Sequence, residues 1–470
     1  MKPAYSHRFA KIAAAFCAVA CAGDSQAQEI PVEPGGMQMR FGITERFEYG
    51  RNLALDVPEE GNGFIASTIL SFGLQSETRT QTLNFDVVTG LRLQDLPNNS
   101  DTFDVGDVRL SFDYSREAAN SGLELQADYL RFDIGFLRSL SDFEDDDGFI
   151  ILPADFTSLT GDGTRNDFSY GLAFDGGRQS LIGYNIRLLA TGIRYEEATD
   201  AEFDDIDTYE GDLGLTFALS PVTTARLVYS KTKFKEDDVD ETDRDSDTFS
   251  FGLAHEISDR TRIDAEIGYT DTSEERRVSG DRSESGVVGG FAVFHDTASA
   301  AYSGEFETSL NTSGRLNRLL FGRSAPIPDG EFSFSIGAAH RPDDTVDAIG
   351  AVSFDREFGP DFFRARLSRD ILTDVDDEYT VATVLDLGYI WRITPVSQFG
   401  LRGTYALTEA TVTSPRVEFT AVSAVYSYEL GQDWRFNAGV DYRVSDDEDI
   451  GRATSPQVFA SIGKEFFWRR

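Results

Sequence analysis

The chain has 470 residues and carries 81 Asp and Glu against 43 Lys and Arg, which gives a formal net charge of −38. A protein this acidic is a poor electrostatic partner for nucleic acid or anionic lipid. Both cysteines, Cys17 and Cys21, lie near the N-terminus, so the rest of the chain has no disulfide framework. No Pro-, Gly- or Ser-rich linker divides the chain, which favours one large domain.

The first residues have the three parts of a secretory signal peptide. Lys2, Arg8 and Lys11 precede the apolar run at 12–23, which is too short to span a membrane. The small residues after this run fit a cleavage site, and the segment therefore predicts export by the Sec route.

Cleavage is predicted after Ala27, with the small residue Ser25 two positions before it. Residues 1–27 are then a cleaved signal peptide and residues 28–37 a short periplasmic segment. The alternative is lipid attachment at Cys21, but the usual Leu three residues before such a cysteine is absent.

From about residue 38 to the end, apolar and polar residues alternate with a period of two, which is typical of strands with one apolar face. Clear examples are segments 64–74, 83–93, 108–114, 213–219, 263–269, 399–407 and 434–444. The strands are about 10–15 residues long. This length is unusual in soluble proteins but suits a tilted membrane crossing of about 9–11 residues.

Two kinds of connection alternate along the chain. Short turns are predicted at 77–80, 220–223, 258–261, 358–361, 394–397 and 431–434, and longer acidic loops at 141–149, 199–207, 235–247, 373–378 and 445–450. This alternation predicts consecutive hairpins and about 22 strands, within a range of 18–24. A β-propeller would place four strands in each repeat of about 40 residues, whereas this chain has about two.

The predicted fold is all-β: a transmembrane antiparallel up-and-down β-barrel over residues 38–470, with short periplasmic turns and long acidic external loops. After residue 27 there is no apolar run of about 18 residues, and only helices and closed barrels satisfy their backbone groups in lipid. We expect it in the outer membrane of a Gram-negative bacterium. The alternative is a large secreted soluble all-β protein, which the strand length and the regular alternation disfavour.

The chain end resembles the C-terminal assembly signal of Gram-negative outer-membrane barrels. The matching residues are Ser461, Gly463, Phe466 and Trp468, although Arg469 and Arg470 follow where many such chains stop. The resemblance implies that the barrel-assembly machinery is a partner during biogenesis.

The wider chain, over about residues 38–470, resembles the β-barrel porin type 2 family of Gram-negative outer-membrane barrels. The resemblance lies in the acidic-loop hairpins, the segment "PIPDGEFSFSIGA" at 326–338 and the ending "VFASIGKEFFWRR". It implies the barrel architecture more firmly than any particular activity.

We find no motif that predicts an enzyme, a cofactor or a metal site. The chain lacks G-x-S-x-G, H-E-x-x-H and P-loop signatures, and His255, His295 and His340 are scattered. The acidic segment at 141–149 fails the EF-hand pattern because Phe143 stands at the first ligand position. Two interpretations of the acidic loops stay open: divalent cations bridging them to lipopolysaccharide, or simple solvation.

Charged residues on the polar strand faces are the candidate channel lining. They are Asp86, Arg92, Arg109, Asp113, Arg262, Asp264, Glu266, Arg364, Arg366, Arg435, Asp441 and Arg443. They either filter solutes by charge or pair with one another across strands. A 22-stranded lumen is wide and usually needs a plug or an infolded loop, and the longest loop, at 138–163, is the best candidate.

The sequence therefore predicts a porin-like channel for passive diffusion of small hydrophilic solutes, with a preference for cations. One alternative is a barrel that exports or anchors a polysaccharide or another secreted polymer. A second is a structural or adhesive barrel whose acidic loops bind cations. The expected partners are outer-membrane lipid and lipopolysaccharide, and nucleic acid is not among them.

Overall fold

The period-two alternation produces strands along nearly all of the chain in a computed structural model. The structure describes residues 36–97, 103–136, 139–145, 148–156, 163–198, 203–431 and 433–469. The predicted signal peptide at 1–27 lies outside the described residues, as does most of the predicted periplasmic segment. The first strand begins at Gly36, two residues before the predicted start of the barrel.

The strands are 11 to 19 residues long. The first eleven are β1 (Gly36–Arg51), β2 (Asn62–Thr78), β3 (Gln81–Asp95), β4 (Phe103–Glu117), β5 (Ser121–Asp133), β6 (Thr164–Gly176), β7 (Ile182–Glu196), β8 (Ile206–Ser220), β9 (Thr223–Glu236), β10 (Asp243–Ser258) and β11 (Thr261–Glu275). The others are β12 (Arg282–Asp296), β13 (Ala301–Asn311), β14 (Gly314–Ile327), β15 (Gly330–His340), β16 (Val346–Phe358), β17 (Asp361–Thr373), β18 (Tyr379–Thr394), β19 (Ser397–Thr408), β20 (Val417–Glu429), β21 (Trp434–Asp447) and β22 (Gly451–Arg469). One short 3-10 helix, η1, covers Leu140–Phe143.

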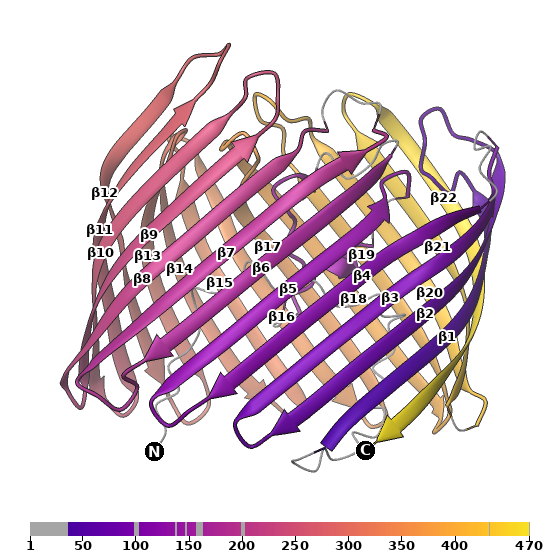
Figure 1. Ribbon diagram of the computed structural model, residues 1–470, viewed down its shortest axis with the longest axis horizontal. Helices are drawn as coiled ribbons and strands as arrows, with labels where there is room; N and C mark the ends of the chain where they lie inside the picture. Colours follow the sequence, from indigo (N-terminus) through magenta and orange to yellow (C-terminus); the bar gives the residue numbers. More distant parts are fainter. Residues whose placement is uncertain are drawn as a thin grey trace.

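Each strand pairs antiparallel with the next, and β1 also pairs with β22, so the 22 strands form a closed up-and-down barrel (Figure 1). Closure gives every strand a paired neighbour on both sides, so no strand is a free edge strand, which a barrel in lipid requires. The prediction of a 22-stranded antiparallel barrel is confirmed. Separately, among the described residues, no helix combines the length and apolar character needed to cross a membrane.

The connections differ between the two ends of the barrel. At the end where β1 starts and β22 finishes, the turns have two to five residues. At the opposite end the connections have two to thirty residues, and the acidic segments lie there (Figure 1). The acidic loop predicted at 235–247 is shorter than expected, because β9 and β10 continue to Glu236 and from Asp243. We call the end with the longer loops the mouth.

The two faces of the wall differ as the alternation predicts. Large apolar side chains such as Phe249, Phe251 and Leu253 are exposed on the outer face. The inner face carries the polar residues, and Ser455 and Asp386 there are almost fully buried. The largest buried apolar cluster lies inside the lumen near the mouth, where a loop packs on the wall.

The β17–β18 hairpin leaves the wall near the mouth. β16 pairs with β17 only as far as Gly350 and Arg369, although β17 continues to pair with β18 beyond that point. By the alternation along these strands, Ile371 and Val381 should face lipid. They are nevertheless only 2% and 1% exposed. They pack with Leu316, Ala339 and Ile349 of β14–β16, so the end of the hairpin folds inward over the lumen.

Candidate functional site

The connection after β5 folds into the lumen and crosses it. We call its described residues, 139–145 and 148–156, the crossing loop. It contains η1 and an isolated bridge between Glu144 and Ile150. The backbone N–H of Phe149 donates to Asp145 Oδ1 at 2.8 Å, and Gly148 has a φ of 79°, which favours glycine. These features make a compact tip that presents Glu144.

The crossing loop packs on the opposite wall through apolar side chains. Its buried members in this cluster are Leu140, Phe143, Ile150, Leu152 and Phe156. Their neighbours come from β18, β19, β20 and β22, namely Ala382, Val384, Ala406, Val417, Phe419 and Ala453. Burial of this many large side chains stabilises the docked position, at about 1.5–3 kcal/mol for each fully buried residue. The predicted infolding of the longest loop therefore has a structural basis.

Charged contacts fix the tip of the crossing loop. Arg364 Nη1 on β17 donates to Glu144 Oε1 at 2.6 Å, and Arg402 Nη2 on β19 donates to Glu144 Oε2 at 2.9 Å. Arg402 also bonds Asp386 at 2.8 Å, and Arg366 bonds Asp355 at 2.8 Å. Hydrogen bonds between charged partners are the strong ones, so this cluster holds the tip of the loop against β17 and β19.

The returning end of the crossing loop is bound to the near wall. Asp155 pairs with Arg165 of β6, and Arg165 Nε donates to Asp167 at 2.6 Å. Arg165 is 5% exposed, and its guanidinium also lies over the rings of Phe132 and Tyr195. The loop is therefore attached at both sides of the lumen.

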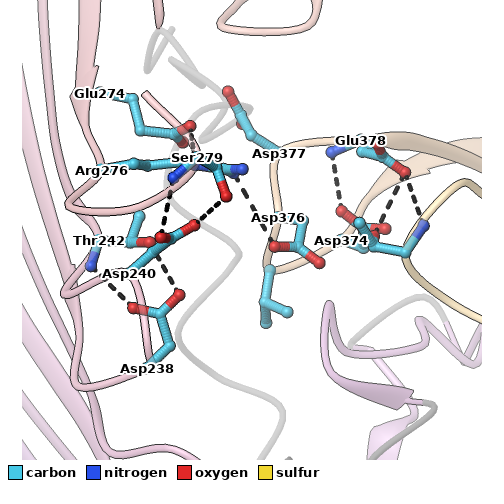
Figure 2. A network of polar contacts seen from close by, with 12 residues as sticks. Asp238, Asp240, Thr242, Glu274, Arg276, Ser279, Asp374, Asp376, Asp377 and Glu378 are labelled. Atoms are coloured by element: carbon cyan, nitrogen blue, oxygen red, sulfur yellow. Dashed lines mark hydrogen bonds and ion pairs between the residues drawn. The ribbon is translucent and has the colours of Figure 1, made fainter. Parts of the chain in front are cut away.

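A second set of contacts lies at the mouth, where the tip of the β17–β18 hairpin reaches β10 and the start of the loop after β11 (Figure 2). Arg244 donates to the carbonyl of Val375 at 3.3 Å and pairs with Asp377 at 3.7 Å. Arg276 pairs with Asp376 at 3.9 Å. Both arginines also bind Glu274, which is fully buried, so a hairpin from one wall is tied to another.

The same hairpin tip is bonded to its other neighbour, the loop at 409–416. Glu378 Oε2 accepts hydrogen bonds from the backbone N–H of Val412 and Thr413 at 2.9 and 3.3 Å. Asp374 accepts from the hydroxyls of Thr411 and Ser414. Contacts thus run across the mouth from β10 to the loop before β20.

Two mouth carboxyls have opposite electrostatic environments. Burial raises the pKa of Asp374 to about 6, and the nearby Asp376 and Glu378 charges add to the increase. The Ser279 hydroxyl and the backbone N–H groups of Val278 and Ser279 bind Asp240 and lower its pKa (Figure 2). Asp374 therefore keeps its proton to a higher pH than an ordinary aspartate, whereas Asp240 loses its proton at a lower pH.

All twelve predicted lining residues lie on the inner face of the wall, and most are paired. Arg262 pairs with Asp264 at 2.7 Å. The other ion pairs are Arg40–Asp86 at 3.2 Å, Arg226–Glu266 at 2.9 Å, Arg92 with Asp107 and Asp133 at 3.3 Å, and Arg364 with Glu144. Asp441 accepts a hydrogen bond from Gln457 at 3.1 Å. Arg435 faces Gly463, and Arg443 is next to Ser455 in the register.

Some inner charges have no such partner among the described residues. Of the predicted set, Arg109 and Asp113 form no ion pair there. Glu210 and Asp212 on β8 also lack a cation within 4 Å, and Arg187 of β7, opposite Asp212 in the register, forms no ion pair. The inner positions of β8–β11 around these acids carry hydroxyls, including Thr232 and the hydrogen-bonded pair Thr248 and Thr270. This part of the wall is hydrophilic, and its unpaired carboxylates, Glu210 and Asp212, make it net acidic.

Sequence reasoning missed the residues that fix the crossing loop. Glu144 lies in the acidic segment at 141–149, but nothing in that segment separates it from its neighbours. The alternation along β19 and β6 places Arg402 and Arg165 on the inner face. Nothing in the sequence distinguishes either arginine from the other inward-facing charged residues. The one local signal is Gly148, whose side-chain-free face lies against the guanidinium of Arg366.

The three histidines among the described residues lie apart on the wall. His255 and His295 contact the hydroxyls of Thr223 and Thr261 at the short-turn end, and His340 lies 3.6 Å from Asp344 at the mouth. Within the described residues, no group of three or more His, Cys, Asp or Glu side chains is arranged to hold a metal ion.

The predicted assembly-signal residues lie on the two faces of β22. Ser461 faces the lumen and accepts a hydrogen bond from Asn437 at 3.3 Å. Gly463 lies opposite Thr44 of β1. Phe466 and Trp468 face outward, and the ring of Phe466 is 6.2 Å from that of Phe41. These residues therefore belong to the seam between the last strand and the first.

Comparisons with known proteins agree with this architecture. The family model described as Gram-negative porin matches residues 102–275. The iron transporter FrpB of Neisseria meningitidis is similar in structure, with a TM-score of 0.59 at 9% identity over 93% of this chain and 83% of that chain. The ferric-catecholate import receptor Fiu of E. coli K12 has a TM-score of 0.57 at 10% identity, over 93% of this chain and 82% of that chain. The ferric enterobactin receptor PfeA of Pseudomonas aeruginosa has a TM-score of 0.54 at 9% identity, over 92% of this chain and 81% of that chain. No curated protein sequence matches the chain.

The porin match agrees with the predicted resemblance to a porin-type outer-membrane barrel. The identities to the solved structures are low, so those structures support the barrel fold alone. The match to the Gram-negative porin model over residues 102–275 and the barrel fold together support an outer-membrane channel.

Proposed function

We propose that this chain is a diffusion channel for small hydrophilic solutes, with a preference for cations, and that the crossing loop sets the size limit. The docking contacts of the loop lie on β6 and on β17–β22. The passage would therefore run along the opposite part of the wall, β7–β12. The observation that carries the proposal is the hydroxyl-lined surface there with the unpaired carboxylates Glu210 and Asp212.

Charge balance supports the cation preference. The lumen arginines near the crossing loop are neutralised by Glu144, Asp355 and Asp386 at 2.6–2.8 Å. The carboxylates on β8 have no such neutralisation among the described residues, and the mouth loops add further acids. A pore with uncompensated acidic groups in a low-dielectric wall attracts cations and repels anions.

The first experiment is single-channel recording of the refolded protein in a planar bilayer under a KCl gradient. We expect steady ohmic steps and a reversal potential of the sign given by cation selectivity. A folded barrel without conductance would contradict the diffusion proposal. Conductance with anion selectivity would contradict the proposed role of Glu210 and Asp212.

A second candidate is regulated uptake, in which a solute must open the mouth before it enters. The observation in its favour is the tie between the β17–β18 hairpin and Arg244 and Arg276. Several structural neighbours are named as iron transporters or ferric-siderophore receptors, which is consistent with such a role. The similarity to these proteins is one of fold alone. A silent barrel that conducts only after Arg244→Gln would favour this candidate.

A further inference from the structure

Tyrosines on the outer face mark the boundary of the apolar band on the mouth side. The Tyr129 hydroxyl of β5 donates to Asn166 Oδ1 at 2.7 Å, and the Tyr269 hydroxyl of β11 donates to Ser285 Oγ at 3.1 Å. In both cases the acceptor lies nearer to the mouth than the tyrosine. Tyrosine girdles of this kind lie where the hydrocarbon meets the headgroups, and the end with the longer loops is the external one. The outward residues just beyond these tyrosines therefore lie at the level of the outer-leaflet headgroups.

At this level β5, β6 and β7 present a row of hydrogen-bond donors to the outside. Asn166 of β6 lies directly opposite Arg131 of β5 on one side and Arg194 of β7 on the other. We call these three residues the donor row. Asn166 and Arg194 are in phase with Tyr170 and Leu188, which are exposed on the outer face of the same strands. Directly opposite residues share a face of the sheet, so the whole donor row points away from the lumen.

Arg131 has no carboxylate to neutralise it. Its Nη1 donates to the carbonyl oxygen of Val105 at 3.3 Å, and no carboxylate of the described residues lies within 4 Å of its guanidinium. Arg194, in contrast, pairs with Asp207 at 2.6 Å and with Asp205 at 3.5 Å. A guanidinium offers a planar fork of donors that matches the oxygens of a phosphate. The donor row therefore has one uncompensated positive charge of the type that suits phosphate.

Asn166 adds a donor that has no acceptor. The residue is only 7% exposed, and its Nδ2 is buried without a hydrogen-bond partner among the described residues. A buried donor left in this state costs about 1–3 kcal/mol. The flanking arginines have long side chains with many rotamers, which can turn aside as an anion approaches. An acceptor supplied from outside the chain would then satisfy the amide.

The neighbouring part of the outer rim has the opposite charge. Just beyond the outer aromatic residues of β9, β10 and β11 lie Lys231, Asp247 and Asp271. Lys231 pairs with Asp247 at 3.0 Å, so one carboxylate remains in excess. An anionic headgroup is therefore favoured at β5–β7 and disfavoured at β9–β11. The net charge of −38 does not prevent this, because salt screens charges beyond about 8 Å.

We propose that the donor row binds a phosphate group of an outer-leaflet lipid, namely the lipid A part of lipopolysaccharide. Lipid A joins phosphate groups to acyl chains in one molecule. Its phosphate meets the arginines and the Asn166 amide, while its chains lie along the apolar outer surface of β5–β7, which includes Tyr170 and Leu188. The site faces lipid, so it does not depend on whether the lumen conducts.

Native mass spectrometry of the refolded chain in detergent tests the ligand. We expect diphosphoryl lipid A to bind at least about tenfold more tightly than the same lipid with both phosphates removed, a difference of about 1.4 kcal/mol. Equal affinity for the two lipids would overturn the proposal, because the acyl chains alone would then account for binding. Inorganic phosphate that displaces lipid A at an equal concentration would assign the donor row to a soluble anion and would also overturn it.

Variants of Arg131 test the position of the site. Arg131→Gln should weaken lipid A binding by about tenfold, as expected for the loss of one charged donor, and Arg131→Lys should recover most of the affinity. Lys231→Gln is the matched control, since it removes a cation just beyond the girdle on β9, and it should leave the affinity unchanged. An equal loss in Lys231→Gln would indicate general attraction to cations. An equal loss in Arg131→Lys would show that Arg131 acts only through the Val105 carbonyl. Either result contradicts the proposed site.

Asn166→Asp is a second variant that keeps both arginines. It hardly changes the size of the side chain, but it places a carboxylate in the middle of the donor row, where it competes with the phosphate for the guanidinium groups. We expect a loss of lipid A affinity at least as large as that of Arg131→Gln, in a barrel whose folding is verified by its heat-modifiable mobility on gels. Unchanged affinity in this variant would exclude the donor row as the binding site.

Discussion

Glu144 in the crossing loop binds Arg364 of β17, 220 positions later in the sequence, with 2.6 Å between Oε1 and Nη1. This bond joins opposite sides of the barrel, because the loop leaves the wall between β5 and β6. Together with the contact to Arg402, it makes the charged contacts of the loop tip depend on one carboxylate. The width of the proposed passage therefore depends on that carboxylate as well.

Replacement of Glu144 by Gln should loosen the crossing loop. Two charge-assisted hydrogen bonds become weaker neutral ones, and the docked position loses about 2 kcal/mol. We expect larger and noisier single-channel conductance in a barrel that still folds. Glu256→Gln, at the short-turn end of β10, is the matched control and should leave the conductance unchanged. Identical traces for the two variants would show that the Glu144 contacts do not position the loop.

Neutralising the unpaired acids of β8 should reduce cation selectivity. Glu210→Gln/Asp212→Asn removes two carboxylates that have no described cation partner, so the reversal potential under a KCl gradient should move toward zero. Arg187→Gln, on the neighbouring strand, removes a base from the same surface and should move the reversal potential further from zero. If neither variant shifts the reversal potential, the passage does not run along β7–β12.

The sequence predicts the wall well and the contents of the lumen poorly. Parity along each strand assigns Asp113 and Arg262 to the inner face, because the period of two is fixed by the pleat. Parity also assigns Ile371 and Val381 to lipid, yet both are buried where the hairpin leaves β16. The departure depends on packing against β14–β16, which strand periodicity does not encode.

Pairing across the lumen has no sequence signal for a different reason. Glu144 and Arg364 meet because the loop spans the barrel, and residues in an irregular loop have no periodicity that assigns them a direction. The length of the connection predicts that it folds inward, but the partner on the far wall follows only from three-dimensional packing.

The hairpin tip at the mouth should be more firmly closed at acidic pH. The folded pKa of Asp374 is about 6, above its ordinary value of 3.8, so the folded tip favours the protonated form. Its stabilising contribution is complete below about pH 4 and is lost as the pH rises through 6. Hydrogen exchange at 374–378 should be slower at pH 5 than at pH 7.5 after correction for the intrinsic rate.

Asp374→Asn should remove this pH dependence, because the amide does not titrate. Asp343 in the neighbouring loop serves as a control, because its pKa is shifted in the opposite direction: the Thr345 hydroxyl lowers it. Its loop at 341–345 should therefore become less protected as the pH falls through the lowered pKa. The same pH response in wild type and Asp374→Asn would assign the effect to another group.

Closure of the barrel between β22 and β1 should depend on the small size of residue 463. A Cβ on Gly463 would lie 2.5 Å from the Thr44 hydroxyl oxygen and 3.5 Å from the carbonyl oxygen of Ile43. Thr has a stiff side chain, so Gly463→Ala should cost about 1–3 kcal/mol through overpacking at the seam. The fraction of folded barrel, measured by heat-modifiable mobility on gels, should fall.

Thr44→Ala removes the clashing oxygen, so Thr44→Ala/Gly463→Ala should recover the folded fraction that Gly463→Ala loses. This rescue separates the two roles proposed for Gly463. If Gly463 is needed for steric reasons at the seam, the second substitution corrects the defect. If the assembly machinery recognises Gly463 in the unpaired last strand, the second substitution does not correct it. Rescue during unassisted refolding but not in cells would assign the glycine to recognition, and rescue in both would assign it to the β22–β1 contact.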